Sequence, residues 1–328
     1  MITIGRRGFI AGAAGAMAWP LAVRAQQRAM PVVGFLDATE SVGAAVTPFR
    51  QGLSETGYIE GRNVEILHRY TNLDYAQLPA LAANLVGSRV DVIVAITGGS
   101  ATALAAKKAT TTIPIVFVIG ADPVGSGLVV SLNRPGANVT GATFLTTELL
   151  AKQVELLHEA VPAATTIGVL VNPTAAQTEG QKREAENAAR ILGIKLLILN
   201  ASAPDEFESA FKRLDGQGNG ALVVAGDVLF GTRLSALAAL SARYKVPTIH
   251  YSRNFVEADG LMSYGASMSD AWRIAGTYVG RILKGEKPGD LPVQQSTRIE
   301  MALNLKTAKA LGLNVPTSIL LRADQVIE

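Results

Sequence analysis

The sequence predicts an α/β protein with two lobes, each a parallel sheet covered by helices on both faces. After residue 30, short apolar segments alternate with segments of helical spacing, as in repeated strand–helix–strand units. The apolar segments have few polar positions, which favours strands buried on both faces of a sheet. A turn-rich break at 133–141 interrupts the alternation, which then restarts. This restart indicates two successive α/β sets joined near residues 140–146.

Composition restricts the class of protein. The 328 residues are enough for two ordinary domains, and 48% of them are apolar. The formal charge of +3 arises from Arg6, Arg7 and Arg24, because residues 1–25 contain no acidic residue and the rest is balanced. No basic stripe then points to nucleic acid. The lack of cysteine excludes disulfides, thiol catalysis and a lipid-modified cysteine, and three separated histidines make a metal site unexpected. We expect no cofactor.

Residues 1–25 are interpreted as an export signal. Arg6 and Arg7 precede an apolar, Ala- and Gly-rich run at 8–23, and small residues place the cleavage site after Ala25. The start resembles a twin-arginine signal. A general secretory signal with two arginines is the alternative, and an uncleaved anchor is disfavoured because the run is too short and Gly-rich. The mature protein is therefore expected to be soluble and periplasmic, and not a lipoprotein.

In the first set, the pattern predicts strands at 32–36, 64–69, 92–96 and 115–119, and helices at 49–56, 75–87 and from 101 onward. Thr97, Gly98, Gly99 and Ser100 follow the third strand. The glycines let backbone approach a ligand closely, and Ser100 can cap the helix. The helix start would then face a small anion. An ordinary capped turn is the alternative. A Gly-rich turn at 120–127 is expected to lead into a short helix.

The second set repeats the pattern, with helices predicted at 148–160, 179–192, 206–214 and 234–244. Its strands are expected at 167–171, 195–199, 221–225 and 248–251. The last section differs, since short extended runs at 260–265 and 298–303 flank an amphipathic helix at 269–283. A short helix follows at 306–311. Such a tail can cross back between the lobes.

Several long stretches are shared with a known family: DPVGSGLV at 122–129, LNRPGANVTG at 132–141, GLMSYG at 260–265, ILKG at 282–285, KPGDLPV at 287–293, NLKTAKALGL at 304–313 and RADQVIE at 322–328. They resemble ABC-transporter substrate-binding proteins related to the tryptophan- and phenylalanine-binding proteins. The resemblance covers essentially the whole mature chain. The turn at 97–100 departs from it, so the ligand is not carried over from the family.

The resemblance implies a type I periplasmic-binding fold, with two lobes joined by three crossover strands and the ligand in the cleft between them. Crossovers are then expected near 143–146, 262–266 and 298–303. The first lobe would comprise 30–143 plus 262–297, and the second 144–261 plus 298–328. Such proteins close around their ligand by hinge motion and deliver it to a membrane permease driven by an ATPase. We expect a monomer, since it must diffuse to the permease.

Candidate ligand-binding residues follow from the strand map, because ligands bind at the carboxyl ends of strands in open α/β sheets. In the first lobe they are Asp37, Thr39, Ser41, Thr97, Gly98, Gly99, Ser100 and Asp122; in the second, Asn172, Thr174, Asp227, Tyr251 and Arg253; on the crossovers, Phe144 and Tyr264. We expect the helix start at Ser100 to hold a carboxylate and Asp227 an ammonium group. The aromatic residues would stack on an apolar side chain.

Each of these assignments has an alternative. Asp122 can be a turn residue bonded to its own backbone, and Asp227 can be a helix cap. Tyr264 can pack in the hinge, and Arg253 can be a surface cation. No catalytic or metal-binding residue is predicted.

The expected function is that of an exported solute-binding protein for a small organic ligand, an amino acid or other carboxylate. An enzyme is one alternative, but the chain lacks a G-x-G-x-x-G helix start, a P-loop, G-x-S-x-G and H-E-x-x-H. An exported ligand sensor that acts with a receptor is another. Both remain open at this point.

Overall fold

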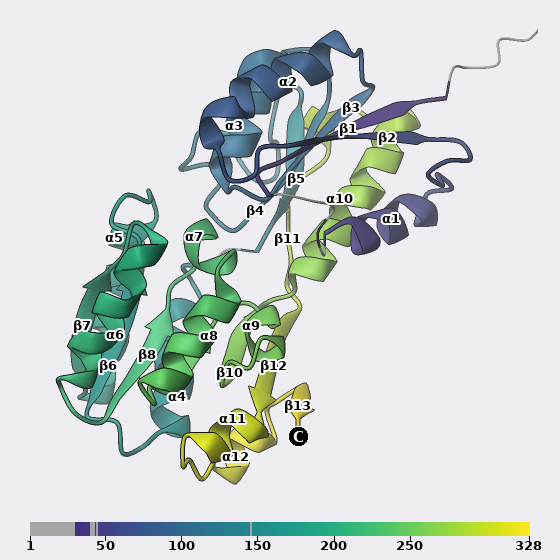
Figure 1. The fold of residues 1–328 in the computed structure, drawn as a ribbon. Coiled ribbons are helices and arrows are strands. Elements are labelled where there is room, and N and C mark those ends of the chain that lie inside the picture. Colours follow the sequence, from purple (N-terminus) through teal and green to yellow (C-terminus); the bar gives the residue numbers. More distant parts are fainter. Residues whose placement is uncertain (1–29, 40–42, 44, 145) are drawn as a thin grey trace, which may run out of the picture.

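The computed structural model describes residues 30–39, 43, 45–144 and 146–328. Two α/β lobes lie one above the other (Figure 1). The predicted fold class is therefore confirmed. Among the described residues, no helix combines the length and apolar character needed to cross a bilayer.

The first lobe is built on a parallel six-stranded sheet. Its strands are β1 (Val32–Asp37), β2 (Glu65–Tyr70), β3 (Val92–Ile96), β4 (Ile115–Ile119), β5 (Val139–Thr143) and β11 (Gln294–Gln295), in the order β11-β5-β4-β3-β1-β2. Its helices are α1 (Val46–Glu55), η1 (Tyr75–Gln77), α2 (Leu78–Gly87), α3 (Ser100–Ala109), α10 (Met268–Leu283) and η3 (Pro288–Asp290). All residues of β3, β4 and β5 are buried. The apolar sequences of β3 and β4 predict this. β5, with the sequence VTGAT, instead begins inside the segment that the sequence predicts as a turn-rich break.

The second lobe contains a seven-stranded sheet of order β13-β12-β10-β9-β8-β6-β7. Its strands are β6 (Thr166–Val171), β7 (Lys195–Asn200), β8 (Gly220–Val224), β9 (Thr248–His250), β10 (Met262–Ala266), β12 (Ile299–Asn304) and β13 (Gln325–Ile327). Its helices are α4 (Leu150–Ala160), α5 (Thr178–Leu192), η2 (Pro204–Glu206), α6 (Phe207–Asp215), α7 (Val228–Gly231), α8 (Leu234–Arg243), α9 (Asn254–Glu257), α11 (Leu305–Ala310) and α12 (Thr317–Leu320). β12 runs antiparallel to β10, whereas the other pairs in this sheet are parallel.

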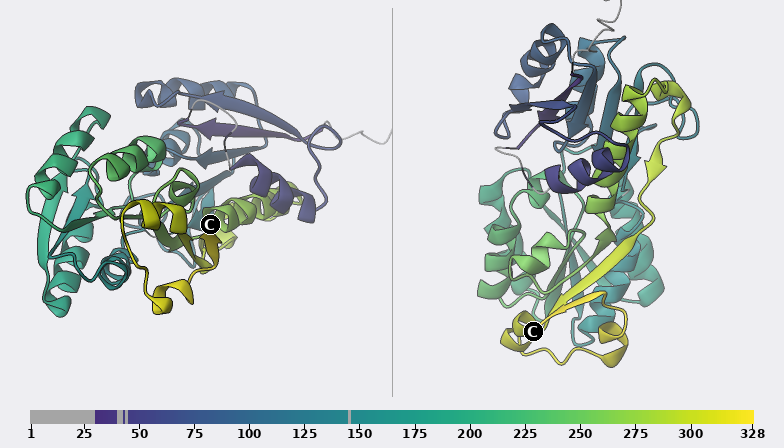
Figure 2. Two further views of the ribbon diagram at one scale, coloured as in Figure 1. Left: turned by 60° about the horizontal axis from the view of Figure 1, so that its bottom comes forward. Right: turned by 90° about the vertical axis from the view of Figure 1, so that its right-hand side faces the viewer.

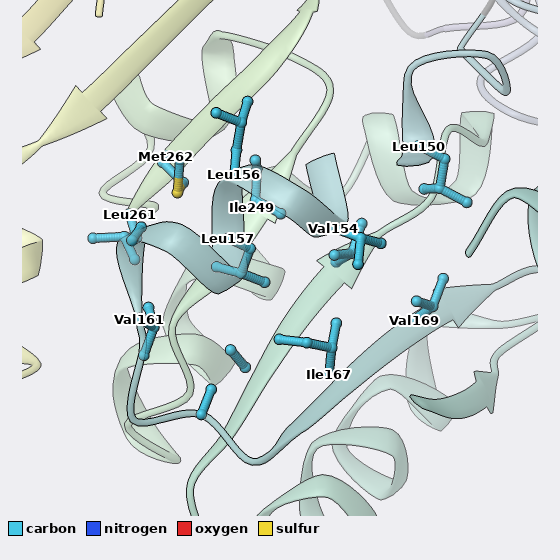
Figure 3. Close-up of a cluster of buried hydrophobic side chains, with 14 of the residues drawn as sticks. Leu150, Val154, Leu156, Leu157, Val161, Ile167, Val169, Ile249, Leu261 and Met262 are labelled. Carbon is cyan, nitrogen blue, oxygen red and sulfur yellow. The ribbon is translucent and has the colours of Figure 1, made fainter. Parts of the chain in front are cut away.

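Each sheet has an apolar core on both faces. In the first lobe, Phe49 of α1 and Tyr278 of α10 pack in the core on one face, and Leu85 of α2 and Ala103 of α3 pack in the core on the other. In the second lobe, α4 packs its apolar face on β8 and β9, and Ile167 and Val169 of β6 belong to the same core (Figure 3). Because strand side chains alternate between faces, central strands such as β3 and β4 contribute to both cores of the first lobe.

The chain crosses between the sheets at three places. It passes from β5 to α4, returns from β10 to α10, and passes again from β11 to β12, which is visible as a long yellow connection (Figure 2). The expectation that 262–297 belongs to the first lobe is wrong at its start. Met262–Ala266 forms β10, which pairs with β9 and β12 of the second sheet. The reason is that Met262 is fully buried in the second-lobe core, so the crossover lies after the strand.

The segment after β4 also differs from its prediction. The turn at 120–127 leads into further turns, and no helix forms there. The backbone N–H groups of Leu128 and Val129 both donate to the Pro123 carbonyl, which closes this segment as a compact loop.

Close packing of α10 on α1 joins the two chain segments of the first lobe. A Cβ at Gly276 of α10 would overlap the Phe49 carbonyl oxygen, and one at Gly52 of α1 would overlap the Arg273 carbonyl oxygen. The two glycines therefore let the helix backbones approach where any side chain would separate them.

We predict that Gly276→Ala destabilises the protein. The added methyl group forces the helices apart, and overpacking of this kind costs about 1–3 kcal/mol. Gly87→Ala is the matched control, because a Cβ there meets nothing within 4 Å. Denaturant unfolding should show a loss for Gly276→Ala and none for Gly87→Ala. Equal stability of the two variants would contradict the close-packing argument.

Candidate binding site between the lobes

Asp37 connects the loops that follow β1 and β3. It ends β1, is 2% exposed, and accepts hydrogen bonds at Oδ1 from Thr39 N (2.8 Å), Thr39 Oγ1 (2.7 Å) and Thr97 Oγ1 (2.6 Å). Thr97 has φ +49°, a conformation that costs energy for a β-branched residue. The bond to Asp37 offsets that cost and holds the start of the next turn in place.

The turn after β3 gives α3 an uncapped N-terminus. Gly98 and Gly99 have φ +86° and +62°, and a Cβ at Gly98 would overlap Thr102 Oγ1. Gly99 is the N-cap residue and Ser100 is the first helical residue, with no side-chain capping bond. The prediction that Ser100 caps the helix is therefore wrong, since the N-cap lies one residue earlier. The first-turn amides of α3 have no capping side chain and can bind an anion.

Asp227 organises the facing edge of the second lobe. It follows β8 and is the N-cap of α7, where its Oδ1 accepts from Leu229 N at 2.9 Å. The helix-cap alternative is thus correct. Its carboxylate also accepts from Asn172 Nδ2 (3.1 Å) and Gln177 Nε2 (3.1 Å). Thr174 donates to Asn172 Oδ1 from its N and its Oγ1, so the strand ends of β6 and β8 form one network.

The two edges meet at Gly99 and Val228. A Cβ at Gly99 would lie 3.5 Å from Val228 Cγ2, so the turn before α3 contacts α7. Tyr75 lies on the same boundary, with its ring against Gly98. Burial, together with the charges of Asp227 and Asp37, raises the pKa of Tyr75 to about 12. Acidic residues from both lobes therefore act on one phenol.

Tyr75 and Gln177 are absent from the sequence-based set. Tyr75 begins η1 directly after the N-cap Asp74, and Gln177 is the N-cap position of α5. Both residues lie where the first helix after a strand begins, which is also the position of Ser100. If every helix start that follows a strand had been taken as a candidate, Tyr75 and Gln177 would have been included.

An aromatic pair lies beside these polar residues. The rings of Phe144 and Tyr251 are 6.5 Å apart between centroids and nearly parallel, at 19°. Burial and the charge of Asp227 raise the pKa of Tyr251, so its phenol stays protonated.

Tyr264 is not brought into this group. Its ring packs on the α4 side of the second lobe and lines a separate pocket of about 280 Å³ with Lys152 and Met301. The pleat of β10 explains this, because Tyr264 and the core residue Met262 are two positions apart and face the same side.

A polar groove of about 500 Å³ opens next to Tyr251, between the starts of α1 and α10 and the end of β9. Three ion pairs line it, each 3.2 Å long: Arg253–Glu257, Arg273–Asp270 and Arg298–Glu300. Arg253 is therefore an exposed, paired cation at the groove. The lining is balanced in charge.

Two predicted residues have other outcomes. Asp122 is exposed and its Oδ1 accepts from Val124 N at 2.8 Å, which matches the turn alternative. Ser41 lies outside the described residues. Across the part of the chain that the structure describes, no cluster of His, Asp or Glu has the arrangement of a metal site.

His250 is buried next to the groove and its Nδ1 accepts from Ser252 N at 2.9 Å. Burial lowers its pKa to about 3. Because the unfolded chain binds a proton near pH 6.5 and the folded chain does not, this histidine makes the protein less stable as pH falls below 6.5.

We predict that stability falls between pH 6.5 and 4 with a slope from His250 that approaches about 1.4 kcal/mol per pH unit once the unfolded histidine is fully protonated. His250→Gln should show a shallower pH dependence of unfolding over the same range. Unfolding in denaturant at pH 7, 6, 5 and 4 measures both slopes. Identical slopes for the two proteins would show that His250 is not the source.

The chain was compared with known proteins. The family model described as ABC transporter substrate binding protein matches residues 21–327. The tyrosine-binding protein of Clostridioides difficile (strain R20291) is 29% identical over 274 residues, which cover 83% of this chain and 78% of that protein.

Two solved structures are similar over 91% of this chain and 100% of theirs. A conserved domain protein from Vibrio cholerae is 30% identical with TM-score 0.81. An ABC domain from Streptococcus pneumonia in complex with L-Trp is 25% identical with TM-score 0.80.

Proposed function

The chain belongs to the family of ABC transporter substrate binding proteins, and from this we propose that it captures an aromatic amino acid between its lobes. Its family and its relatives are solute-binding proteins and not enzymes, and so is this protein. The observation that carries the ligand class is the contact of Gly99 with Val228, which puts an uncapped helix start opposite Asp227.

This arrangement suits the two charges of an amino acid. The first-turn amides of α3 would bind the carboxylate, helped by the positive end of the helix dipole. Asp227 would accept the ammonium group. A carboxylate has about four acceptor positions, and Leu229, Asn172 and Gln177 use three of them. One position is left for a ligand donor.

Two further observations support an aromatic side chain. Phe144 and Tyr251 supply two nearly parallel rings, and the charge of Asp227 acts on the phenol of Tyr251. The relatives include a tyrosine-binding protein and a structure bound to L-Trp.

Export and delivery complete the proposal. Arg6 and Arg7 with the apolar run that follows them support export, cleavage after Ala25 and a periplasmic location. Membership of the family supports delivery of the ligand to an ABC-type permease and its ATPase. A monomer fits that role.

We predict that L-tyrosine, L-tryptophan or L-phenylalanine raises the melting temperature of the purified protein. A ligand that binds only the folded state stabilises it by an amount that grows with its concentration over Kd. The same acids without the amino group, such as 3-(4-hydroxyphenyl)propionate, should bind more weakly because Asp227 then faces no cation. A thermal-shift series followed by calorimetry measures both. The proposal fails if none of the three amino acids binds.

We predict that Asp227→Asn weakens binding of the amino acid by roughly 10- to 100-fold, since a hydrogen bond between charged groups is worth about 1.5–3 kcal/mol. The Asn side-chain oxygen still accepts from Leu229 N, so α7 keeps its cap. Glu179→Gln is the control, with the same loss of charge on the exposed face of α5. Calorimetry on the three proteins should separate them. Equal affinity of Asp227→Asn and the control would remove Asp227 from the site.

A further inference from the structure

We propose that the contact of Thr146 with Gly226 holds Asp227 opposite the first lobe and thereby sets how tightly the protein keeps its ligand. This inference rests on the proposed function, in which Asp227 must face the start of α3. Thr146 and Gly226 are positioning residues, because they act through Asp227 and need no contact with the ligand. Three features carry the inference: the place of Thr146 between two strand ends, the anchoring of Gly226, and interlobe contacts on both sides of Asp227.

Thr146 lies between the ends of two strands that belong to different lobes. It is on the crossover from β5 to α4 and is 7% exposed. Towards the first lobe, its N and its Oγ1 donate to the carbonyl oxygen of Gly120, the residue after β4, at 3.0 and 3.3 Å. Towards the second lobe, its side chain fills the space that Gly226 leaves free after β8. A Cβ at Gly226 would overlap Thr146 Cβ and Oγ1.

Gly226 is anchored within its own lobe. Its carbonyl oxygen accepts from Gln181 Nε2 at 2.8 Å and from Gln177 Nε2 at 3.3 Å, and Gln181 is 1% exposed. Gly226 is not among the residues with a left-handed φ, so its backbone accepts an alanine and only Thr146 opposes one. Since both partners are held by hydrogen bonds to opposite lobes, a side chain at position 226 would push the lobes apart.

Asp227 stands between two contacts with the rest of the first-lobe edge. Gly226, before it, packs on Thr146, and Val228, after it, packs on Gly99 in the turn before α3. These contacts fix the backbone on both sides of Asp227 and therefore its position relative to the start of α3. A ligand that bridges the two groups needs this arrangement, and its apparent affinity falls with the fraction of molecules that adopt it.

The three crossovers are bonded together close to Thr146. Ser296, after β11, donates from its N to the Thr143 carbonyl oxygen at 2.8 Å, and its Oγ donates to the Ser267 carbonyl oxygen at 3.2 Å. Ser267 N in turn donates to the Arg298 carbonyl oxygen at 2.8 Å. The lobes can therefore rotate about this junction but not slide past it. The Thr146–Gly226 contact then limits how closely the ends of β4 and β8 approach.

The test measures affinity by calorimetry, with whichever of L-tyrosine, L-tryptophan and L-phenylalanine binds the wild type most tightly. Gly226→Ala should bind it at least tenfold more weakly. Gly216→Ala, in the same lobe, is the matched control, because the nearest atom to a Cβ there is the Lys212 carbonyl oxygen at 3.6 Å. It should bind within threefold of the wild type.

A compensating change separates a steric wedge from general damage. Thr146→Gly removes the side-chain atoms that an alanine at position 226 would meet. The variant with both Thr146→Gly and Gly226→Ala should therefore bind more tightly than Gly226→Ala and within threefold of Thr146→Gly. Independent damage at the two positions would add instead.

A second measurement needs no ligand. The chain has no cysteine, so spin labels on Lys108→Cys and Glu186→Cys, at exposed positions of α3 and α5, report the distance between the lobes (Figure 1). Gly226→Ala should shift this distance to longer values than in the wild type. Adding Thr146→Gly should return it to the value of Thr146→Gly alone.

A folded Gly226→Ala that binds like the wild type, or a double variant more than threefold weaker than Thr146→Gly, would overturn this inference and leave the proposed function standing. If Gly226→Ala does not fold, the double variant decides, because relief of the overlap should restore folding and binding; an unfolded double variant overturns the inference. If no aromatic amino acid binds, the proposed function fails. The label distances then decide this inference, and equal distances in the wild type and Gly226→Ala overturn it.

Discussion

The packing of α10 on α1 is the contact on which the two-lobe arrangement depends. Thr277 Oγ1 donates to the Gly52 carbonyl across a sequence separation of 225 residues, and Gly276 lies against the Phe49 backbone. Because this contact returns the chain to the first lobe after the second is nearly complete, the polypeptide must cross between the sheets three times. The crossings lie together, so the lobes are tied at one side while the carboxyl ends of their strands face each other (Figure 2).

The facing strand ends are held in place before any ligand arrives. Asp37 binds Thr97 in a left-handed conformation, and Asp227 accepts from Leu229 on its own helix and from Asn172 and Gln177 on the loop between β6 and α5. Breaking one hydrogen bond of such a network leaves a buried polar group without a partner, which costs free energy. Each edge is therefore held in one arrangement. Rigid edges on two lobes joined by short crossovers are the arrangement expected of a protein that closes by hinge motion.

Tyr251 connects the two parts of the candidate site. Its ring is close to Phe144 and its hydroxyl reaches the helix capped by Asp227, while its backbone borders the polar groove. Tyr251 thus borders both the polar residues around Asp227 and the polar groove.

The sequence by itself determined most strands, most helices, the two successive α/β sets and the strand-end residues such as Asp37 and Asp227, because hydrophobic periodicity and turn residues are local signals. It missed β5, β11 and β13, which lack a run of apolar residues. The stretches that resemble the family further predicted how the chain crosses between the two lobes. The tertiary structure decided those features that depend on packing between residues far apart in the sequence. β10 joined the second sheet because Met262 is buried there, and the same pleat turned Tyr264 away from the site. Likewise, the charge of Asp227 acts on Tyr75 only because the two lobes contact each other, and no local pattern encodes a partner on the other lobe.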